Sequence, residues 1–312
     1  MNLAPASEEI KESIISKIRC ANCRRSNLVV ELVTDFEGRI SCPYCNATYP
    51  IRRGILFLAD PKASDWDRIY ETPIRGNLAR TLNDHIKLIE KALREERSLL
   101  SYFILAHLAK KTIARSRDSI EIGCGSGTYS LILKKLKIAS TSYLVDRSLN
   151  ALLNAQRIFS IFDEKAIYVL GDALNLPFKE NAFDLAFSGG LIEHFKYKEQ
   201  QRIISEHCRL ANRILCQVPT NSIPYWIQRM GLTLLNKRWP FGYERPLSQS
   251  TLKKYFKNSG FVVKSFMYHD PLTAFLFRAS IRHPWIGGLA SKHFLNRLLK
   301  HEVVVYAQKG MV

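Results

Sequence analysis

The segment Glu121–Thr128, with the sequence EIGCGSGT, constrains the fold of this 312-residue chain more than any other. The strand-like run Ser119-Ile-Glu-Ile leads into Gly123, Gly125 and Gly127, and a helical pattern of apolar residues follows. Glycine has no Cβ, so a turn built from it lets the backbone approach a ligand closely. The segment therefore predicts a strand, a tight turn and a helix, with a ligand at the turn. Its spacing differs from the dinucleotide pattern G-x-G-x-x-G.

Acidic residues recur at the ends of the next two predicted strands. Asp146 follows the predicted strand at residues 141–145, and Asp172 follows the one at residues 166–171. Open parallel sheets bind ligands beyond the carboxyl ends of their strands, so these acids are expected beside the glycine turn. A carboxylate at Asp146 can accept both ribose hydroxyls of a nucleoside cofactor. Ser148 is a suitable N-cap for the helix that follows, and further strands are predicted at residues 183–190, 213–219, 261–268 and 302–308.

Over about residues 118–265, these motifs resemble the class I S-adenosylmethionine-dependent methyltransferases. The resemblance implies an α/β fold, with a Rossmann-like seven-stranded, mostly parallel sheet and helices on both faces. It implies S-adenosylmethionine as cofactor, with Asp172 facing the adenine amine. The residues expected at the cofactor are Glu121, Gly123, Cys124, Gly125, Gly127, Asp146, Arg147, Asp172, Ala173, Leu174 and Ser188.

The segment after the fourth predicted strand holds the candidate catalytic residues. Methyl transfer needs a general base only when the acceptor carries its proton into the transition state. His194 is the first candidate for that base and Glu193 the second. The segment resembles the generic small-molecule branch of the family. It has no N/D-P-P-Y/F motif and no Pro-Cys pair, which argues against methylation of adenine amines and of cytosine C5.

Four cysteines form two C-x2-C pairs, Cys20 with Cys23 and Cys42 with Cys45, separated by eighteen residues. This spacing predicts a structural Zn²⁺ site, because four thiolates leave no open coordination position. Residues 18–60 resemble the small zinc-ribbon activator subunits of tRNA and protein methyltransferases. Fused ribbons also open the rRNA guanine-N1 methyltransferases, in which a histidine usually stands where this chain has Cys45. Thiol ligands require a reducing compartment, so a cytoplasmic location is expected.

The pattern predicts three regions. Residues 1–60 form the zinc ribbon, 61–117 a helical linker or cap with amphipathic helices over 83–111, and 118–312 the methyltransferase domain. Two inserts, 221–247 and 271–300, follow the fifth and sixth predicted strands and are expected to build the acceptor side of the pocket.

Positive charge is concentrated at the C-terminal end. Residues 221–312 carry fourteen basic and three acidic side chains, a balance of +11 within a net charge of +18. Aromatic residues among these cations suit a small or lipid-like acceptor and contact with an anionic membrane surface. They also suit RNA, whose bases stack on aromatic rings. A third interpretation is a non-catalytic scaffold that binds the cofactor. The residues alone leave the acceptor open.

Overall fold

The structure is a computed structural model. It describes residues 8–32, 34, 37–60, 66–67, 70, 86–87, 89–90, 93, 108–111, 116–234, 242–269 and 302–310. The predicted insert 271–300, residues 235–241 and most of the predicted helices over 83–111 lie outside these residues. The elements in chain order are α1 (Glu8–Lys17), β1 (Val29–Leu32), β2 (Gly38–Ser41), β3 (Thr48–Arg52), β4 (Ile55–Phe57), β5 (Ser116–Ile122), α5 (Thr128–Lys135), β6 (Ala139–Asp146), α6 (Leu149–Ile161), β7 (Ile167–Leu170), β8 (Leu185–Gly189), the 3-10 turn η1 (Ile192–His194), α7 (Tyr197–Leu210), β9 (Arg213–Pro219), α8 (Ile223–Leu234), α9 (Gln249–Asn258), β10 (Phe261–His269) and β11 (Glu302–Lys309).

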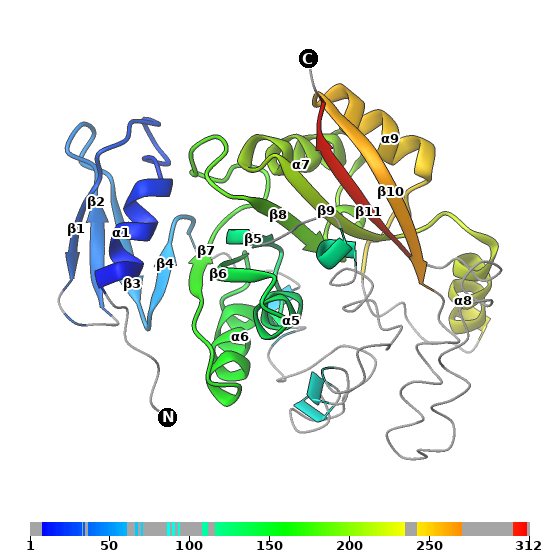
Figure 1. The fold of residues 1–312 in the computed structure, drawn as a ribbon, viewed down its shortest axis with the longest axis horizontal. Coiled ribbons are helices and arrows are strands. Elements are labelled where there is room, and N and C mark those ends of the chain that lie inside the picture. The colour runs from blue at the N-terminus through cyan, green and yellow to red at the C-terminus, as the bar shows by residue number, and fades with distance from the viewer. Residues whose placement is uncertain are drawn as a thin grey trace.

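One large sheet organises the molecule (Figure 1). Its strand order is β1-β2-β3-β4-β7-β6-β5-β8-β9-β11-β10. The six neighbours from β4 to β9 are mutually parallel, whereas β11 runs antiparallel to both β9 and β10. The seven predicted strands are present as β5 to β11. The sheet has eleven strands rather than seven, because β1 to β4 continue it beyond β7.

Helices cover both faces of the sheet. Side chains alternate along each strand, so Tyr143 and Val145 of β6 join one core while Leu144 between them joins the other. The first core packs against α1, α7 and α9, and the second against α5 and α6. The predicted N-cap of α6 is confirmed, because the Ser148 hydroxyl accepts a hydrogen bond from the Ala151 amide at 3.2 Å. Gly260, with φ of 77°, follows α9 as expected for a helix end.

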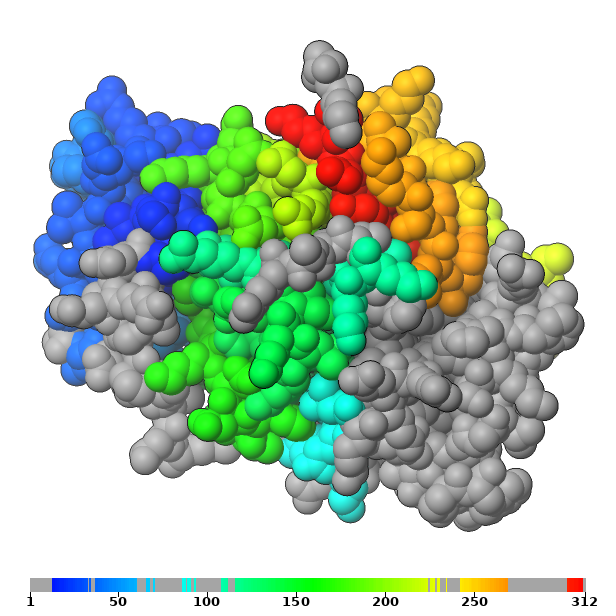
Figure 2. All heavy atoms as spheres, viewed as in Figure 1, coloured from blue at the N-terminus to red at the C-terminus, as the bar shows by residue number. Residues whose placement is uncertain are grey.

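The N-terminal strands do not form a separate sheet. Strand β4 pairs in parallel with β7, with Ile55 opposite Tyr168 and Phe57 opposite Leu170. Beyond the sheet, the Lys17 ammonium lies 2.8 Å from the Asp118 carboxylate. In Figure 2 the blue N-terminal atoms adjoin green atoms from the middle of the chain. Residues on both sides of the predicted boundary at 60 therefore share one core.

No helix among the described residues combines the length and the apolar character that a membrane crossing requires.

Candidate functional site

A pocket opens at the carboxyl ends of β5, β6, β7 and β8. The space inside it, part of which is open to solvent, is about 660 Å³. The chain moves from β5 outward to β6 and β7, then crosses back to β8 on the other side of β5. Ligands of open α/β sheets bind at such a reversal. The lining residues are Trp66, Tyr70, Ile122, Gly123, Val145, Asp146, Arg147, Gly171, Asp172, Ala173, Gly190, Leu191, His194 and Phe195.

The glycine turn after β5 is tied to the end of β6. The Gly125 amide donates a hydrogen bond to Asp146 Oδ2 at 2.8 Å, and the Ser148 amide donates to Oδ1 at 2.9 Å. Burial raises the pKa of Asp146, and these two amides act in the opposite direction because they stabilise the carboxylate. Gly125 has φ of 53°, and a Cβ there would collide with the Tyr70 hydroxyl. A side chain at this position would be strained by the backbone conformation and would have to displace the Tyr70 hydroxyl.

The other predicted nucleoside contacts lie at the end of β7. Asp172 Oδ1 accepts a hydrogen bond from the Leu174 amide at 3.0 Å. Its Oδ2 lies 3.6 Å from the Arg147 guanidinium, which comes from the end of β6. Asp172, Ala173 and Arg147 all line the pocket, next to Asp146. The polar side of the pocket therefore lies beyond β6 and β7.

The opposite side, beyond β8, is apolar and aromatic apart from His194. The His194 ring packs edge-on against Trp66 with 4.7 Å between centroids, and Leu191 and Phe195 line the same side. His194 Nδ1 lies 2.8 Å from the Tyr243 carbonyl oxygen. A carbonyl oxygen can only accept, so Nδ1 carries the proton and Nε2 of the neutral ring keeps a lone pair. Burial lowers the pKa of His194 and so favours the neutral ring.

Several residues expected at the cofactor do not line the pocket. Glu121 turns to α5, where Oε2 accepts hydrogen bonds from the Ser130 amide at 3.0 Å and its hydroxyl at 2.6 Å. Burial raises the pKa of Glu121 to about 8. The other expected residues outside the lining are Cys124, Gly125, Gly127, Leu174 and Ser188. Gly125 still shapes the wall through its contacts with Asp146 and Tyr70.

Glu193, the second candidate base, also lies outside the lining. Its side chain is 4% exposed, and its Oε1 lies 3.9 Å from His194 Nε2. Burial raises the pKa of Glu193 well above the ordinary value, and the nearby Glu244 and Glu302 act in the same direction. A carboxyl group in this environment holds its proton, which makes Glu193 a poorer base than His194.

Trp66 and Tyr70 are lining residues that the sequence did not reveal. Asn154 of α6 donates a hydrogen bond to the Tyr70 carbonyl oxygen at 3.1 Å, and Asn150 donates to the Asp67 carbonyl oxygen at 3.1 Å. Ser148 donates to the Asp67 carboxylate at 2.6 Å. The two aromatic residues lie more than fifty positions before the glycine turn. The one signal available was two aromatic residues in a polar segment, which is too common to be informative.

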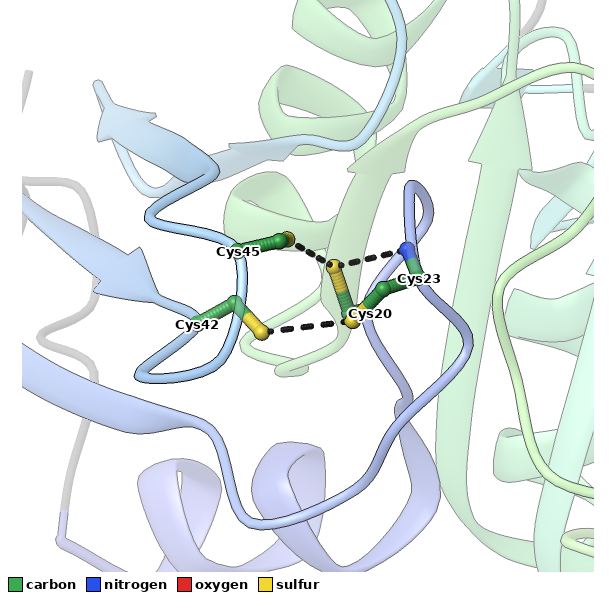
Figure 3. A group of neighbouring side chains, drawn as sticks. All are labelled: Cys20, Cys23, Cys42 and Cys45. Carbon is green, nitrogen blue, oxygen red and sulfur yellow. Dashed lines mark hydrogen bonds between the residues drawn. The ribbon is translucent and has the colours of Figure 1, made fainter.

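The second candidate site is the group of four cysteines (Figure 3). Cys20 and Cys23 precede β1, and Cys42 and Cys45 lie between β2 and β3. The four sulfur atoms lie within 4.8 Å of one another. Sγ atoms of Cys20 and Cys45 are 3.5 Å apart, and those of Cys23 and Cys42 are 3.6 Å apart. Tetrahedral zinc with bonds of about 2.3 Å needs sulfurs about 3.8 Å apart. The four side chains therefore fit a tetrahedral zinc ion.

The two cysteine pairs have the same backbone turn. The Arg24 amide donates to the Cys20 carbonyl oxygen at 3.0 Å, and the Asn46 amide donates to that of Cys42 at 2.9 Å. Arg24 and Asn46 both have positive φ, 62° and 58°. This turn aims both thiols of a pair to one side. The Tyr49 hydroxyl lies 3.1 Å from Cys20 Sγ, a partner of the kind that orients metal ligands.

Comparison with known proteins adds two kinds of similarity. Residues 120–213 match the family model described as "Methyltransferase domain". Norajmaline N-methyltransferase of Rauvolfia serpentina is 28% identical over 130 residues, 40% of this chain and 39% of that protein. Ajmaline N-methyltransferase of the same plant is 30% identical over 98 residues, 31% and 33% of the two chains. This chain thus spans well under half the length of these relatives.

Two solved structures share the fold. Magnesium protoporphyrin IX methyltransferase from Synechocystis PCC 6803, with bound SAH, has a TM-score of 0.50 and 14% identity, over 78% of this chain and 93% of that one. A chain from the complex between the Haloferax volcanii Trm112 methyltransferase activator and the putative methyltransferase has a TM-score of 0.51 and 15% identity. It covers 80% of this chain and all of its own length. Residues 120–213 are thus similar to a methyltransferase domain, and the chain shares the fold of these two solved structures.

Proposed function

We propose that this protein is an S-adenosylmethionine-dependent methyltransferase that acts on a small or lipid-like acceptor. The observation that carries the proposal is the two-sided pocket at the sheet reversal. Asp146, Arg147 and Asp172 line the side beyond β6 and β7, and an aromatic wall with His194 lines the side beyond β8. A nucleoside fits the first side and an apolar acceptor the second.

Asp146 and Asp172 are the proposed nucleoside contacts. The Asp146 carboxylate would accept the ribose hydroxyls, and Asp172 with Ala173 would meet the adenine ring. The Gly123–Gly127 turn would bring its backbone against the cofactor, and Leu191 lies close enough to Gly123 that a Cβ there would collide with it. When bound, the cofactor supplies an electrophilic methyl group, and this chain positions it and excludes water.

His194 is the proposed general base. Its Nε2 carries the lone pair, its ring is held by the Tyr243 carbonyl oxygen and Trp66, and its side chain is 11% exposed. It would take the acceptor's proton at Nε2 as the methyl group arrives. The rest of the rate acceleration would come from positioning, because methyl transfer is an in-line displacement at the methyl carbon.

Zn²⁺ is the proposed occupant of the four cysteines, with a structural role. The four thiolates would fill its coordination shell and leave no position for a substrate. The ribbon made of α1 and β1 to β4 would then be stabilised by the metal. Because β4 pairs with β7, that stability would extend to the strand whose end carries Asp172.

RNA is a second candidate acceptor, favoured by the balance of +11 in residues 221–312. Labelled S-adenosylmethionine incubated with separate RNA, lipid and small-molecule extracts tests both candidates. The proposal predicts label in the lipid or small-molecule fraction. Label confined to RNA, together with RNA binding that weakens steeply as salt rises, would contradict the small or lipid-like acceptor and favour RNA.

A further inference from the structure

The outward face of α8 is apolar. Ile223, Trp226, Ile227, Met230 and Leu234 recur at the spacing of a single helix face. Their exposures are 77%, 44%, 59%, 58% and 83%. An ordinary surface helix turns such a stripe toward the core and its polar residues toward water. Among the side chains of α8 that the structure describes, the arrangement is the reverse, and the helix lies at the rim of the molecule (Figure 1).

The inner face of α8 is fixed by polar contacts. Tyr225 is fully buried, and its hydroxyl accepts a hydrogen bond from Arg229 Nη1 at 2.9 Å. The same nitrogen donates to the Glu244 carbonyl oxygen at 3.1 Å. These buried contacts hold the orientation of the helix, so the apolar stripe cannot turn inward without breaking them.

Helix α8 is joined to the acceptor side of the pocket through residues 243–245. Arg229 contacts the Glu244 carbonyl, the neighbouring Tyr243 carbonyl meets the His194 ring, and the Arg245 amide donates to the Glu193 carbonyl oxygen at 2.8 Å. A surface that docks on the stripe is therefore connected through α8 and residues 243–245 to the aromatic side of the pocket.

We propose that the exposed stripe of α8 docks on an anionic lipid bilayer. An interfacial helix buries apolar side chains at the boundary of the headgroups, while nearby cations attract anionic lipid. The stripe holds Trp226, whose indole N–H is satisfied by Asn221 Oδ1 at 2.7 Å while the ring is exposed. Arg229 lies 5.7 Å from that ring, on the helix itself. Residues 221–312, the part of the sequence that contains α8, have a balance of +11, which complements an anionic membrane and opposes pairing with a second copy.

Delivery of the acceptor from the bilayer rests on the proposed function, whereas docking itself does not. With the stripe on a membrane, α8 would lie between the bilayer and residues 243–245, and an apolar acceptor would pass around the helix to the wall made by Trp66, Leu191 and Phe195. Vesicle binding therefore tests docking even if no methyl transfer is found.

The test is co-sedimentation of the full chain with phosphatidylcholine vesicles, with and without phosphatidylserine. We expect binding to the phosphatidylserine vesicles that weakens as salt rises. The triple variant Ile227→Ser, Met230→Ser and Leu234→Ser should bind them at least about tenfold more weakly, because three exposed apolar side chains are lost. The matched control is Val29→Ser, Ile161→Ser and Val262→Ser, which removes three half-exposed apolar side chains on other elements and should bind as the original chain does.

Both triple variants should keep the S-adenosylhomocysteine affinity of the original chain, because all six side chains lie outside the pocket, and should change the melting temperature by similarly small amounts, because all six are at least 44% exposed. Failure of the original chain to bind vesicles would overturn the proposal, as would equal binding by the two triple variants. A dimer that forms in sedimentation equilibrium and is lost only in the α8 variant would assign the stripe to a second copy instead. Loss of cofactor binding in the original chain would contradict the proposed function and leave the vesicle result standing.

Discussion

The Gly125 amide donates a hydrogen bond to the Asp146 carboxylate at 2.8 Å, which ties the turn after β5 to the end of β6. Two sequence motifs that lie twenty-one residues apart thus form one unit. Asp146 also accepts from the Ser148 amide and lines the pocket. The carboxylate has two tasks, because it holds the glycine turn in place and faces the proposed ribose.

Asp146→Ala should weaken S-adenosylhomocysteine binding by roughly 10- to 100-fold, because charge-assisted hydrogen bonds contribute about 1.5–3 kcal/mol each. Isothermal titration measures the change. Asp146→Asn keeps an acceptor oxygen but loses the charge, so its affinity for S-adenosylhomocysteine should lie between those of the original protein and of Asp146→Ala. The exposed carboxylate Asp60 provides the control, since Asp60→Ala should bind normally. Unchanged affinity in Asp146→Ala would remove this residue from the cofactor site.

Gly125→Ala should lower the affinity for the cofactor in addition to lowering the stability of the fold. The reason is that the new Cβ would push Tyr70 out of the pocket wall. Gly242→Ala is a matched control, since Gly242 has φ of 64° and a Cβ added there would meet no other atom within 4 Å. The left-handed conformation costs both variants about 1–2 kcal/mol of stability. Thermal melting and titration separate the two effects. Equal cofactor affinities in the two variants would contradict the close approach of Tyr70.

Glu121 should make the folded state less stable as pH rises. Its folded pKa of about 8 lies above the ordinary value of 4.5, so the folded state holds a proton that the unfolded state releases between these values. The stability that this proton contributes is complete below about 4.5 and is lost as pH rises toward 8. Within the window, the slope is roughly 1.4 kcal/mol per pH unit.

The variant Glu121→Gln tests this slope, because an amide does not titrate. Urea unfolding of both proteins without cofactor, across pH 5 to 8 (about the window set by the pKa values), should give curves that diverge in favour of the variant as pH rises. Glu180→Gln, on an exposed carboxylate, should leave the slope unchanged. Parallel curves for the original chain and Glu121→Gln would show that Glu121 is ionised in the folded protein.

His194→Ala should lower kcat by roughly 100-fold, as expected for loss of a general base, while cofactor affinity stays the same. In the original protein, turnover should fall as pH decreases through the pKa of His194, which burial places below 6.5. The variant should lack this fall. A pH profile with the labelled acceptor measures both effects. An unchanged rate and profile would leave His194 with a structural role only.

Cys42→Ser should remove the bound metal and lower the melting temperature of the whole chain by roughly 5–10 °C, because a structural zinc contributes several kcal/mol to folding and each kcal/mol shifts the melting temperature by roughly 1.5 °C in a chain of 312 residues. The unfolding should remain a single transition, since β4 pairs with β7 and one core joins the ribbon to the central sheet. Metal analysis should find one zinc per chain originally and much less in the variant. Cys208→Ser, a buried thiol outside the metal site, should retain its zinc. Two separate melting transitions would contradict the shared core.

The local signals were readable in the sequence, and the long-range contacts were not. The glycine turn, the acids at strand ends, the Ser148 cap and the cysteine spacing each depend on residues close together in the chain, and each is present as expected. The pairing of β4 with β7 joins residues more than a hundred positions apart, and short apolar runs do not specify a partner. The positions of Trp66 and Tyr70 in the pocket could not be predicted either, because they depend on contacts with residues far along the chain. Glu121 was expected at the cofactor, but its carboxyl group instead accepts hydrogen bonds from Ser130 in the first turn of α5.

The most direct test of the proposed cofactor site is a crystal structure of the protein with S-adenosylhomocysteine. We predict the nucleoside at the ends of β6 and β7, with its ribose hydroxyls on the Asp146 carboxylate, its adenine beside Asp172 and Ala173, and its sulfur directed toward His194. A nucleoside bound elsewhere, or one that leaves Asp146 without a contact to the ribose, would contradict this prediction.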